Sequence, residues 1–163
     1  METRPANPTD SAGCAQAPAQ VSIQRHYPVA PEKVWRAWTD PQVMSQWFGA
    51  GMNGPGAAVE IDLRVGGSFR IAFPGPNGES HEARGVYQEV LAPERLVFSW
   101  FWKSTPERVS RISIGFERVA EGCDLSFVHD RFFDDQARIN HERGWQPFFE
   151  KLGDFLNHHE QEA

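Results

Sequence analysis

The order of hydrophobic and polar residues predicts one strand and two short helices in the first part of the chain. Residues 21–27 alternate between apolar and polar side chains, which is typical of a strand with one buried face. Residues 31–39 and 41–48 repeat their hydrophobic positions at helical spacing, and each segment opens on a proline. Because Asp40 is a suitable cap and Gly49 a suitable stop, we expect two helices in tandem.

Between residues 58 and 130 the pattern changes to short alternating runs separated by turn residues. Glycine, proline and asparagine cluster between the runs, and these residues favour the tight turns of antiparallel hairpins. The spacing predicts a meander of six strands, near 58–64, 68–74, 82–91, 95–102, 109–117 and 123–130.

The last part of the chain predicts one long amphipathic helix with a broad aromatic face. Its hydrophobic side chains recur every three or four residues: Trp145, Phe148, Phe149, Leu152, Phe155 and Leu156. Pro147 lies within this pattern and lacks the N–H group that a helix interior uses. We expect the helix to start near Asp134 and to be kinked at the proline.

The order of these elements indicates an α+β fold with a seven-stranded antiparallel sheet. One face of such a sheet is apolar, and the long helix carries the matching hydrophobic stripe. Where a curved sheet wraps around a helix without meeting it everywhere, an apolar cavity is left between them. The length of 163 residues and the 40% hydrophobic content fit one domain, which we place at residues 21–158.

Charge and composition narrow the classes of partner. The net charge of -6 and the pI near 5.5 oppose binding to nucleic acid or to an anionic membrane, because those surfaces attract an excess of Lys and Arg. Residues 1–20 have the composition of a disordered leader, and the chain has no apolar run of transmembrane length. Since Cys14 lies in that leader and Cys123 in a strand, we expect no disulfide and a cytoplasmic location.

The stretch DLRVGGSFR, residues 62–70, permits two interpretations. A phosphate-binding loop would need its glycines to lead into the N-terminus of a helix, whose free N–H groups hold the anion. The residues after the glycine pair at 66–67 alternate as a strand instead, so a hairpin turn is favoured. Arg64 and Arg70 are then expected on the polar face of the hairpin, with Asp62 as their ionic neighbour.

Several motifs, taken in their order along the chain, resemble the START-like (SRPBCC) superfamily. They are DLRVGGSFR, Gly78 in PNGES, GVYQEV, PERLVFSW, DLSFVHDRF and the pair Gly144-Trp145 in the last helix. More narrowly, they resemble the branch named after homologues of the activator of heat-shock-protein ATPase. The resemblance extends from about Val21 to Leu156 and leaves out only the leader.

The resemblance implies a helix-grip fold, in which the seven-stranded sheet wraps around the long C-terminal helix and leaves a pocket for hydrophobic ligands. It implies less about function, because the superfamily includes lipid carriers, hormone receptors, polyketide cyclases, resistance proteins and co-chaperone domains. We expect a monomer or homodimer that binds a small hydrophobic molecule without a cofactor. A cyclase or aromatase using the same cavity is one alternative, and a co-chaperone-like interaction module is another.

Eight ring-bearing side chains are the candidates for ligand contact, which the 12% aromatic content favours. They are Trp47, Phe48, Phe98, Trp100, Trp102, His129, Trp145 and Phe149. The alternative for each is ordinary core packing. We expect Trp102 at the pocket mouth beside residues 103–108 and residues 49–56 as a candidate gate. The resemblance implies that Gly144 lies near the entrance, where it would permit close backbone approach.

His129 is the most polar of these candidates. It shares a strand face with Leu125 and Phe127 and therefore points toward the helix or the cavity. It is either a hydrogen-bonded structural residue or a donor that orients a polar group of the ligand. A general base would need an orienting carboxylate, and Asp130 lies on the opposite strand face. With no metal-ligand spacing among the histidines and no nucleophile or nucleotide motif, we expect no metal site and no catalytic residue.

Overall fold

Seven strands form a single antiparallel sheet in the computed structural model, which describes residues 20–48, 57–74 and 80–162, with side chains up to Asn157. The strand order across the sheet is β1-β7-β6-β5-β4-β3-β2. The strands are β1 (Val21–Tyr27), β2 (Ala58–Ile61), β3 (Ser68–Pro74), β4 (Ser80–Leu91), β5 (Arg95–Trp102), β6 (Ser110–Val119) and β7 (Gly122–Asp130). The α+β fold class expected from the sequence is therefore confirmed.

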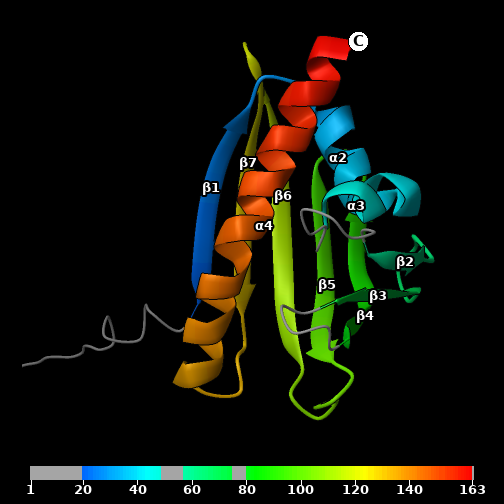
Figure 1. Ribbon diagram of the computed structural model, residues 1–163, viewed down its shortest axis with the longest axis vertical. Helices are drawn as coiled ribbons and strands as arrows, with labels where there is room; N and C mark the ends of the chain where they lie inside the picture. Colours follow the sequence, from blue (N-terminus) through cyan, green and yellow to red (C-terminus); the bar gives the residue numbers. More distant parts are fainter. Residues whose placement is uncertain (1–19, 49–56, 75–79, 163) are drawn as a thin grey trace, which may run out of the picture.

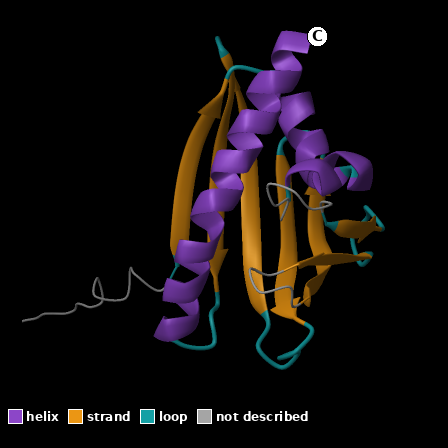
Figure 2. Cartoon of the chain, viewed as in Figure 1, coloured by secondary structure: helices purple, strands orange, loops and turns teal. Residues whose placement is uncertain are grey.

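Three helices cover one face of the sheet (Figure 1, Figure 2). They are α2 (Pro31–Thr39), α3 (Pro41–Trp47) and α4 (Asp135–Glu162). The long helix α4 crosses in front of β1, β7 and β6, while α2 and α3 lie beside it (Figure 1). The expected leader, the candidate gate at 49–56 and the Gly78 turn lie outside the described residues.

Local chemistry explains where the helices begin. Asp40 follows α2 and caps α3, because its Oδ1 accepts a hydrogen bond from the Gln42 N–H at 3.0 Å. Asp134 caps α4 in the same way, accepting from the Ala137 N–H at 2.8 Å. The expected start of this helix is thus correct to one residue, and α4 continues without interruption through Pro147.

The core lies between the sheet and the hydrophobic stripe of α4. Trp145, Phe149 and Leu152 are at most 3% exposed. Phe127 of β7 lies beneath the helix, with ring-centroid distances of 4.8 Å to Trp145 and 5.0 Å to Phe149. The Trp38 ring of α2 completes this cluster at 5.9 Å from Phe149. The helical spacing of the aromatic residues therefore determines which side of α4 faces the sheet.

The glycine pair at 66–67 is part of a turn between two strands, as the sequence predicts. Strand β2 ends at Ile61, earlier than expected, because the chain turns back over residues 62–67. Gly66 has a φ of 87°, a conformation that favours glycine. Asp62 pairs with Arg64 at 2.9 Å. Asp62 was also expected beside Arg70, and this expectation was wrong, because Arg70 pairs with Glu82 and Glu60.

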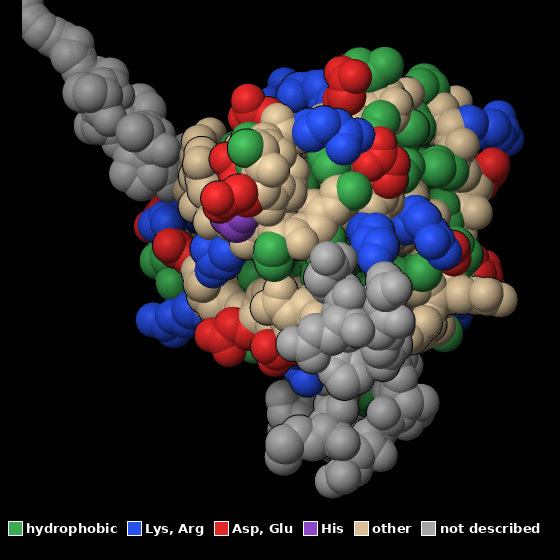
Figure 3. Space-filling model, turned by 90° about the horizontal axis from the view of Figure 1, so that it is seen from above, with side chains coloured by type: hydrophobic (Ala, Val, Ile, Leu, Met, Phe, Trp, Pro, Cys, Tyr) green, Lys and Arg blue, Asp and Glu red, His purple; other side chains and the backbone are tan. Residues whose placement is uncertain are grey.

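The charged side chains at the end of the molecule that carries the C-terminus are of mixed sign. Figure 3 shows Lys and Arg groups next to Asp and Glu groups there, with hydrophobic side chains between them. This view shows no broad field of one charge, which fits the modest net charge of the chain. Among the described helices, none has a stretch long and apolar enough to span a bilayer.

Candidate functional site

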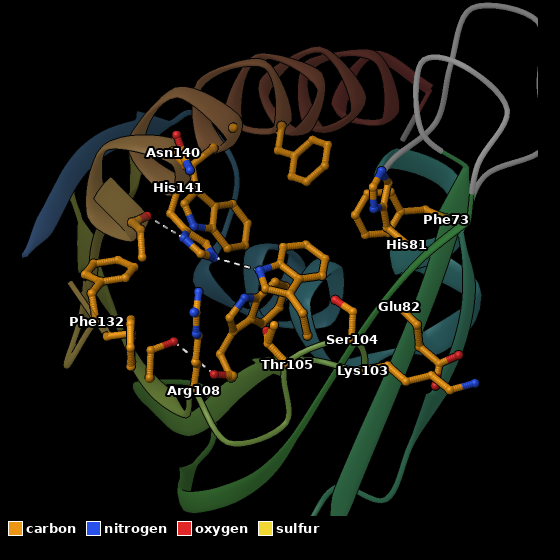
Figure 4. A pocket seen from close by; sticks show the side chains of 18 of the residues that line it. Phe73, His81, Glu82, Lys103, Ser104, Thr105, Arg108, Phe132, Asn140 and His141 are labelled. Carbon is orange, nitrogen blue, oxygen red and sulfur yellow. Dashed lines mark hydrogen bonds between the residues drawn. The ribbon is translucent and has the colours of Figure 1, made fainter. Parts of the chain in front are cut away.

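A pocket of about 1360 Å³ lies between the sheet and the N-terminal half of α4 (Figure 4). Its walls come from β3, β4, β5, the start of β6, the loop between β5 and β6, the loop between β7 and α4, and α4 itself. The innermost lining residues are Trp100, Ser110 and Trp145, which are at most 5% exposed. The rim carries exposed polar residues such as Ser104 and Asn140. The pocket therefore has an aromatic floor and a polar mouth.

His129 lies behind this floor and is fully hydrogen-bonded. Its side chain is 0% exposed. The Trp145 Nε1–H donates to His129 Nδ1 at 3.1 Å, and His129 Nε2 contacts Ser110 Oγ at 2.7 Å. The Ser110 hydroxyl donates to the Trp100 carbonyl oxygen at 2.9 Å. These bonds join α4, β7, β6 and β5 through one chain of polar atoms.

The directions of these bonds assign the protonation state of His129. An indole N–H can only donate, so His129 Nδ1 must accept and carries no proton. The proton of the neutral ring is then on Nε2, which donates to Ser110 Oγ. Burial, with a smaller effect from the neighbouring His141, holds the pKa of His129 well below its usual range. His129 is consequently a neutral, satisfied structural residue.

Ser110 and His129 are as close as a catalytic serine and its general base, but the proton is donated in the opposite direction. A base that activates a serine must accept the hydroxyl proton. Here His129 Nε2 is the donor, and the serine proton is used at the Trp100 carbonyl oxygen. Asp130, the nearest carboxylate in the sequence, pairs with Arg111 at 2.9 Å. The contact therefore stabilises the fold and does not form a catalytic dyad.

A second histidine, which is half-buried, repeats the arrangement from the helix side. His141 of α4 accepts a hydrogen bond from the Trp102 Nε1–H at 2.9 Å and donates from Nδ1 to the Ala137 carbonyl oxygen at 2.7 Å (Figure 4). Burial lowers the pKa of His141 as well. Its ring centroid lies 4.9 Å from that of His129. The two neutral imidazoles are therefore neighbours, each held by one indole.

Three of the eight residues predicted for ligand contact line the pocket: Trp100, Trp102 and Trp145. The other five, Trp47, Phe48, Phe98, His129 and Phe149, are not among its lining residues and are at most 5% exposed. Trp47 donates its Nε1–H to the Ala37 carbonyl oxygen at 2.8 Å, inside the core. Ligand contact stays a prediction, and we carry it forward for the three lining tryptophans.

The sequence interpretation missed several lining residues. His141 precedes Trp145 by one helical turn, so extending the aromatic stripe backward by four residues would have placed it on the same face. Arg108, Phe132 and Phe133 lie in loops, where no periodicity indicates direction. Gly144 does line the pocket, but the expectation of close backbone approach was wrong, because a Cβ there would meet no described atom within 4 Å.

Neither the cysteine thiol nor a cluster of metal-ligating side chains offers a second reactive site among the described residues. Cys123 is buried, and burial raises the pKa of its thiol to about 11, which makes it a poor nucleophile. Within the part of the chain that the structure describes, no group of three His, Cys, Asp or Glu side chains could hold a metal ion.

Comparison with known proteins gives a family and a set of similar folds. The family model for Activator of Hsp90 ATPase homolog 1-like protein matches residues 28–157. The crystal structure of CV1439 from Chromobacterium violaceum has a TM-score of 0.74 and 25% identity, covering 85% of this chain and 97% of that one. The crystal structure of NE0264 from Nitrosomonas europaea has a TM-score of 0.73 and 21% identity, and the match covers 89% of this chain and 98% of that one.

A third similar structure comes from an actinomycete. CalU16 from Micromonospora echinospora has a TM-score of 0.66 and 25% identity, covering 84% of this chain and 75% of that chain. No curated protein matches the sequence. The similarities support the fold, while the chemistry of the pocket has to be argued from its own residues.

Proposed function

Because the chain belongs to the family of Activator of Hsp90 ATPase homolog 1-like proteins and has an aromatic pocket beneath its long helix, we propose that it binds a small hydrophobic molecule there. The observation that carries this proposal is the pocket itself. Its volume of about 1360 Å³ is large enough for a molecule of several rings.

The lining supports a planar, apolar occupant. Trp100, Trp102, Trp145, Phe73 and Phe148 present ring surface to the pocket. Burial of apolar surface contributes about 25 cal/mol per Å², so a ligand that covers two or three such rings gains several kcal/mol. Loss of ring hydration is thus the main driving force that we propose.

One buried N–H group at the floor of the pocket could donate a hydrogen bond to a polar atom of the ligand. The Trp100 Nε1–H is buried and has no acceptor among the described residues. An unsatisfied buried donor costs about 1–3 kcal/mol, which a ligand acceptor that reached it would recover. By contrast, the Trp102 and Trp145 N–H groups are already bonded to His141 and His129.

The cyclase alternative has less support from the geometry. It needs a group that moves protons, and His129 was the candidate for that role. Both of its ring nitrogens are occupied by Trp145 and Ser110. Two charged residues of neighbouring strands are paired with other residues, Arg111 with Asp130 and Glu89 with Arg95.

A pocket-filling substitution at Gly144 tests the proposal. Gly144 lines the pocket and has open space at its Cβ, so we expect the side chain of Gly144→Leu to take up part of the pocket volume. Gly144→Ala is the matched control, because alanine and leucine are both strong helix formers and differ mainly in volume. Binding of N-phenyl-1-naphthylamine is followed by dye fluorescence and by quenching of the protein tryptophans.

We expect the wild type and Gly144→Ala to bind the dye, and Gly144→Leu to bind it at least about tenfold more weakly, as loss of a few methylene-sized contacts predicts. Equal affinity of all three proteins would place the dye outside this pocket. Absence of binding to the wild type, repeated across a panel of apolar aromatic compounds, would contradict the proposal.

A further inference from the structure

Arg108 stands apart from the other charged residues around the pocket. It belongs to the loop between β5 and β6, and its side chain extends into the pocket between Phe132 and Thr105 (Figure 4). Its guanidinium carbon lies 4.0 Å from the centroid of the Phe133 ring, a cation–π contact from the loop between β7 and α4. The stacking holds the guanidinium plane at the mouth of the pocket.

The hydrogen-bonding capacity of this guanidinium is unused. Its nearest carboxylate is that of Glu107, at 3.8 Å between Nε and Oε2, which is beyond hydrogen-bond distance. No hydrogen bond from the Arg108 side chain to another described residue is formed. Arg70 and Arg111, in contrast, donate to Glu82 and Asp130 at 2.9–3.1 Å. Arg108 is thus oriented by a ring and has its donors available.

The acidic residues of the pocket do not neutralise Arg108. Glu82 is held by Arg84 and by Arg70, whose hydrogen bonds lower the pKa of that carboxyl. Asp134 accepts the Ala137 N–H at the start of α4. Lys103, the neighbouring cation of the same loop, points away from Arg108 (Figure 4). Arg108 therefore brings a cationic group to the mouth of the pocket, and among the described residues its ion pair is the loose one with Glu107.

We propose that the ligand of this pocket is an aromatic acid, whose ring system lies against the tryptophans and whose oxyanion is bound by Arg108. This inference rests on the proposed function and specifies its ligand class. A planar guanidinium presents parallel N–H groups that match the two oxygens of a carboxylate or the oxygens of a sulfonate. A ring on its other face leaves those N–H edges free, so stacking and anion binding are compatible.

Two dyes with the same ring system test the proposal. 8-Anilinonaphthalene-1-sulfonate carries an oxyanion, and N-phenyl-1-naphthylamine is the same molecule without it. Each is titrated by fluorescence into the wild type, Arg108→Gln and Arg108→Lys. The control is Arg64→Gln, which removes an exposed arginine from the turn at 62–67, outside the lining residues. Circular dichroism confirms that each variant is folded.

The proposal expects a specific loss of affinity for the anion. Arg108→Gln should weaken binding of the sulfonate dye about five- to tenfold, as loss of a partly exposed charge-assisted hydrogen bond predicts, and should leave the neutral dye unchanged. Arg108→Lys should bind the sulfonate dye with intermediate affinity, because lysine keeps the positive charge but lacks the parallel N–H groups of the guanidinium. Arg64→Gln should behave as the wild type.

Two other outcomes overturn the proposal in distinguishable ways. If both dyes bind the wild type and Arg108→Gln affects neither or both equally, the oxyanion site is refuted while the hydrophobic pocket stands. If neither dye binds the wild type, the proposed function fails, and the inference that depends on it fails with it.

Discussion

Two tryptophan N–H groups determine which nitrogen carries the proton in His129, which is buried, and in His141, which is half-buried. Trp145 donates to Nδ1 of His129, whereas Trp102 donates to Nε2 of His141. Because an indole cannot accept, the two imidazoles must be opposite tautomers. The sequence indicates that His129 faces inward, but the direction of a hydrogen bond depends on which atom of a distant residue meets the ring.

This tautomer assignment is directly measurable. In a long-range ¹H–¹⁵N correlation spectrum at pH 7.5, His129 should show an unprotonated Nδ1 and a protonated Nε2, and His141 the reverse. Trp145→Phe should remove the donor to His129 and change the pattern of that ring, while His141 keeps its own. Two rings of the same tautomer, or a protonated imidazolium at this pH, would refute the network.

Most elements of the fold could be predicted from local sequence because each has a local cause. The helix starts follow from Asp40 and Asp134, whose carboxylates cap backbone N–H groups that any helix leaves unpaired. Strand β2 was predicted too long because the residues after Ile61 continue an alternating pattern although the chain has begun its turn. The turn is decided by hydrogen bonds such as that from the Gly66 N–H to the Tyr87 carbonyl oxygen, far away in sequence.

Two glycines in strands of the sheet, Gly85 and Gly115, differ in the space around the position of a Cβ atom. A Cβ added at Gly85 of β4 would lie 1.8 Å from the Ser99 carbonyl oxygen and 2.5 Å from the Phe69 ring. A Cβ at Gly115 of β6 would first meet Ser126, at 4.0 Å. The first glycine lets adjacent strands and a buried ring approach closely, and the second does not.

We therefore expect Gly85→Ala to lower the free energy of unfolding by about 1–3 kcal/mol, the cost of overpacking a close contact. Gly115→Ala, the matched strand variant, should change it by less than about 0.5 kcal/mol. Urea denaturation followed by tryptophan fluorescence measures both values. Similar values for the two variants would mean that the close approach of β4 and β5 is not rigid.

At the scale of the whole molecule, His129 and His141 couple stability to pH. Burial lowers the pKa of both His129 and His141 in the folded state, whereas an unfolded histidine titrates near about 6.5. The unfolded state therefore takes up protons first as the pH falls. The stabilisation is fully present above about pH 7 and is lost as the pH drops below the unfolded value.

We expect the free energy of unfolding to fall between pH 7.5 and pH 5.5, with a slope of at most about 1.4 kcal/mol per pH unit for each histidine. Glu82, whose pKa is lowered chiefly by Arg84, acts in a separate window below its usual value of 4.5. His141→Gln should make the fall smaller in denaturation curves measured across this range, because one of the two histidines with a lowered pKa is removed. A flat profile in the wild type would contradict the burial of neutral imidazoles.

The sequence by itself determined the order of elements, the caps of the helices, the hydrophobic face of α4 and the antiparallel sheet, because hydrophobic periodicity and turn chemistry act over a few residues. Tertiary structure alone decided which aromatic rings line the pocket and which are core. Trp100 and Phe98 occupy the same strand face, yet only Trp100 reaches the cavity. The position of Arg108 over Phe133 is likewise a contact between two loops, and contacts between residues distant in sequence depend on how the sheet and α4 are packed.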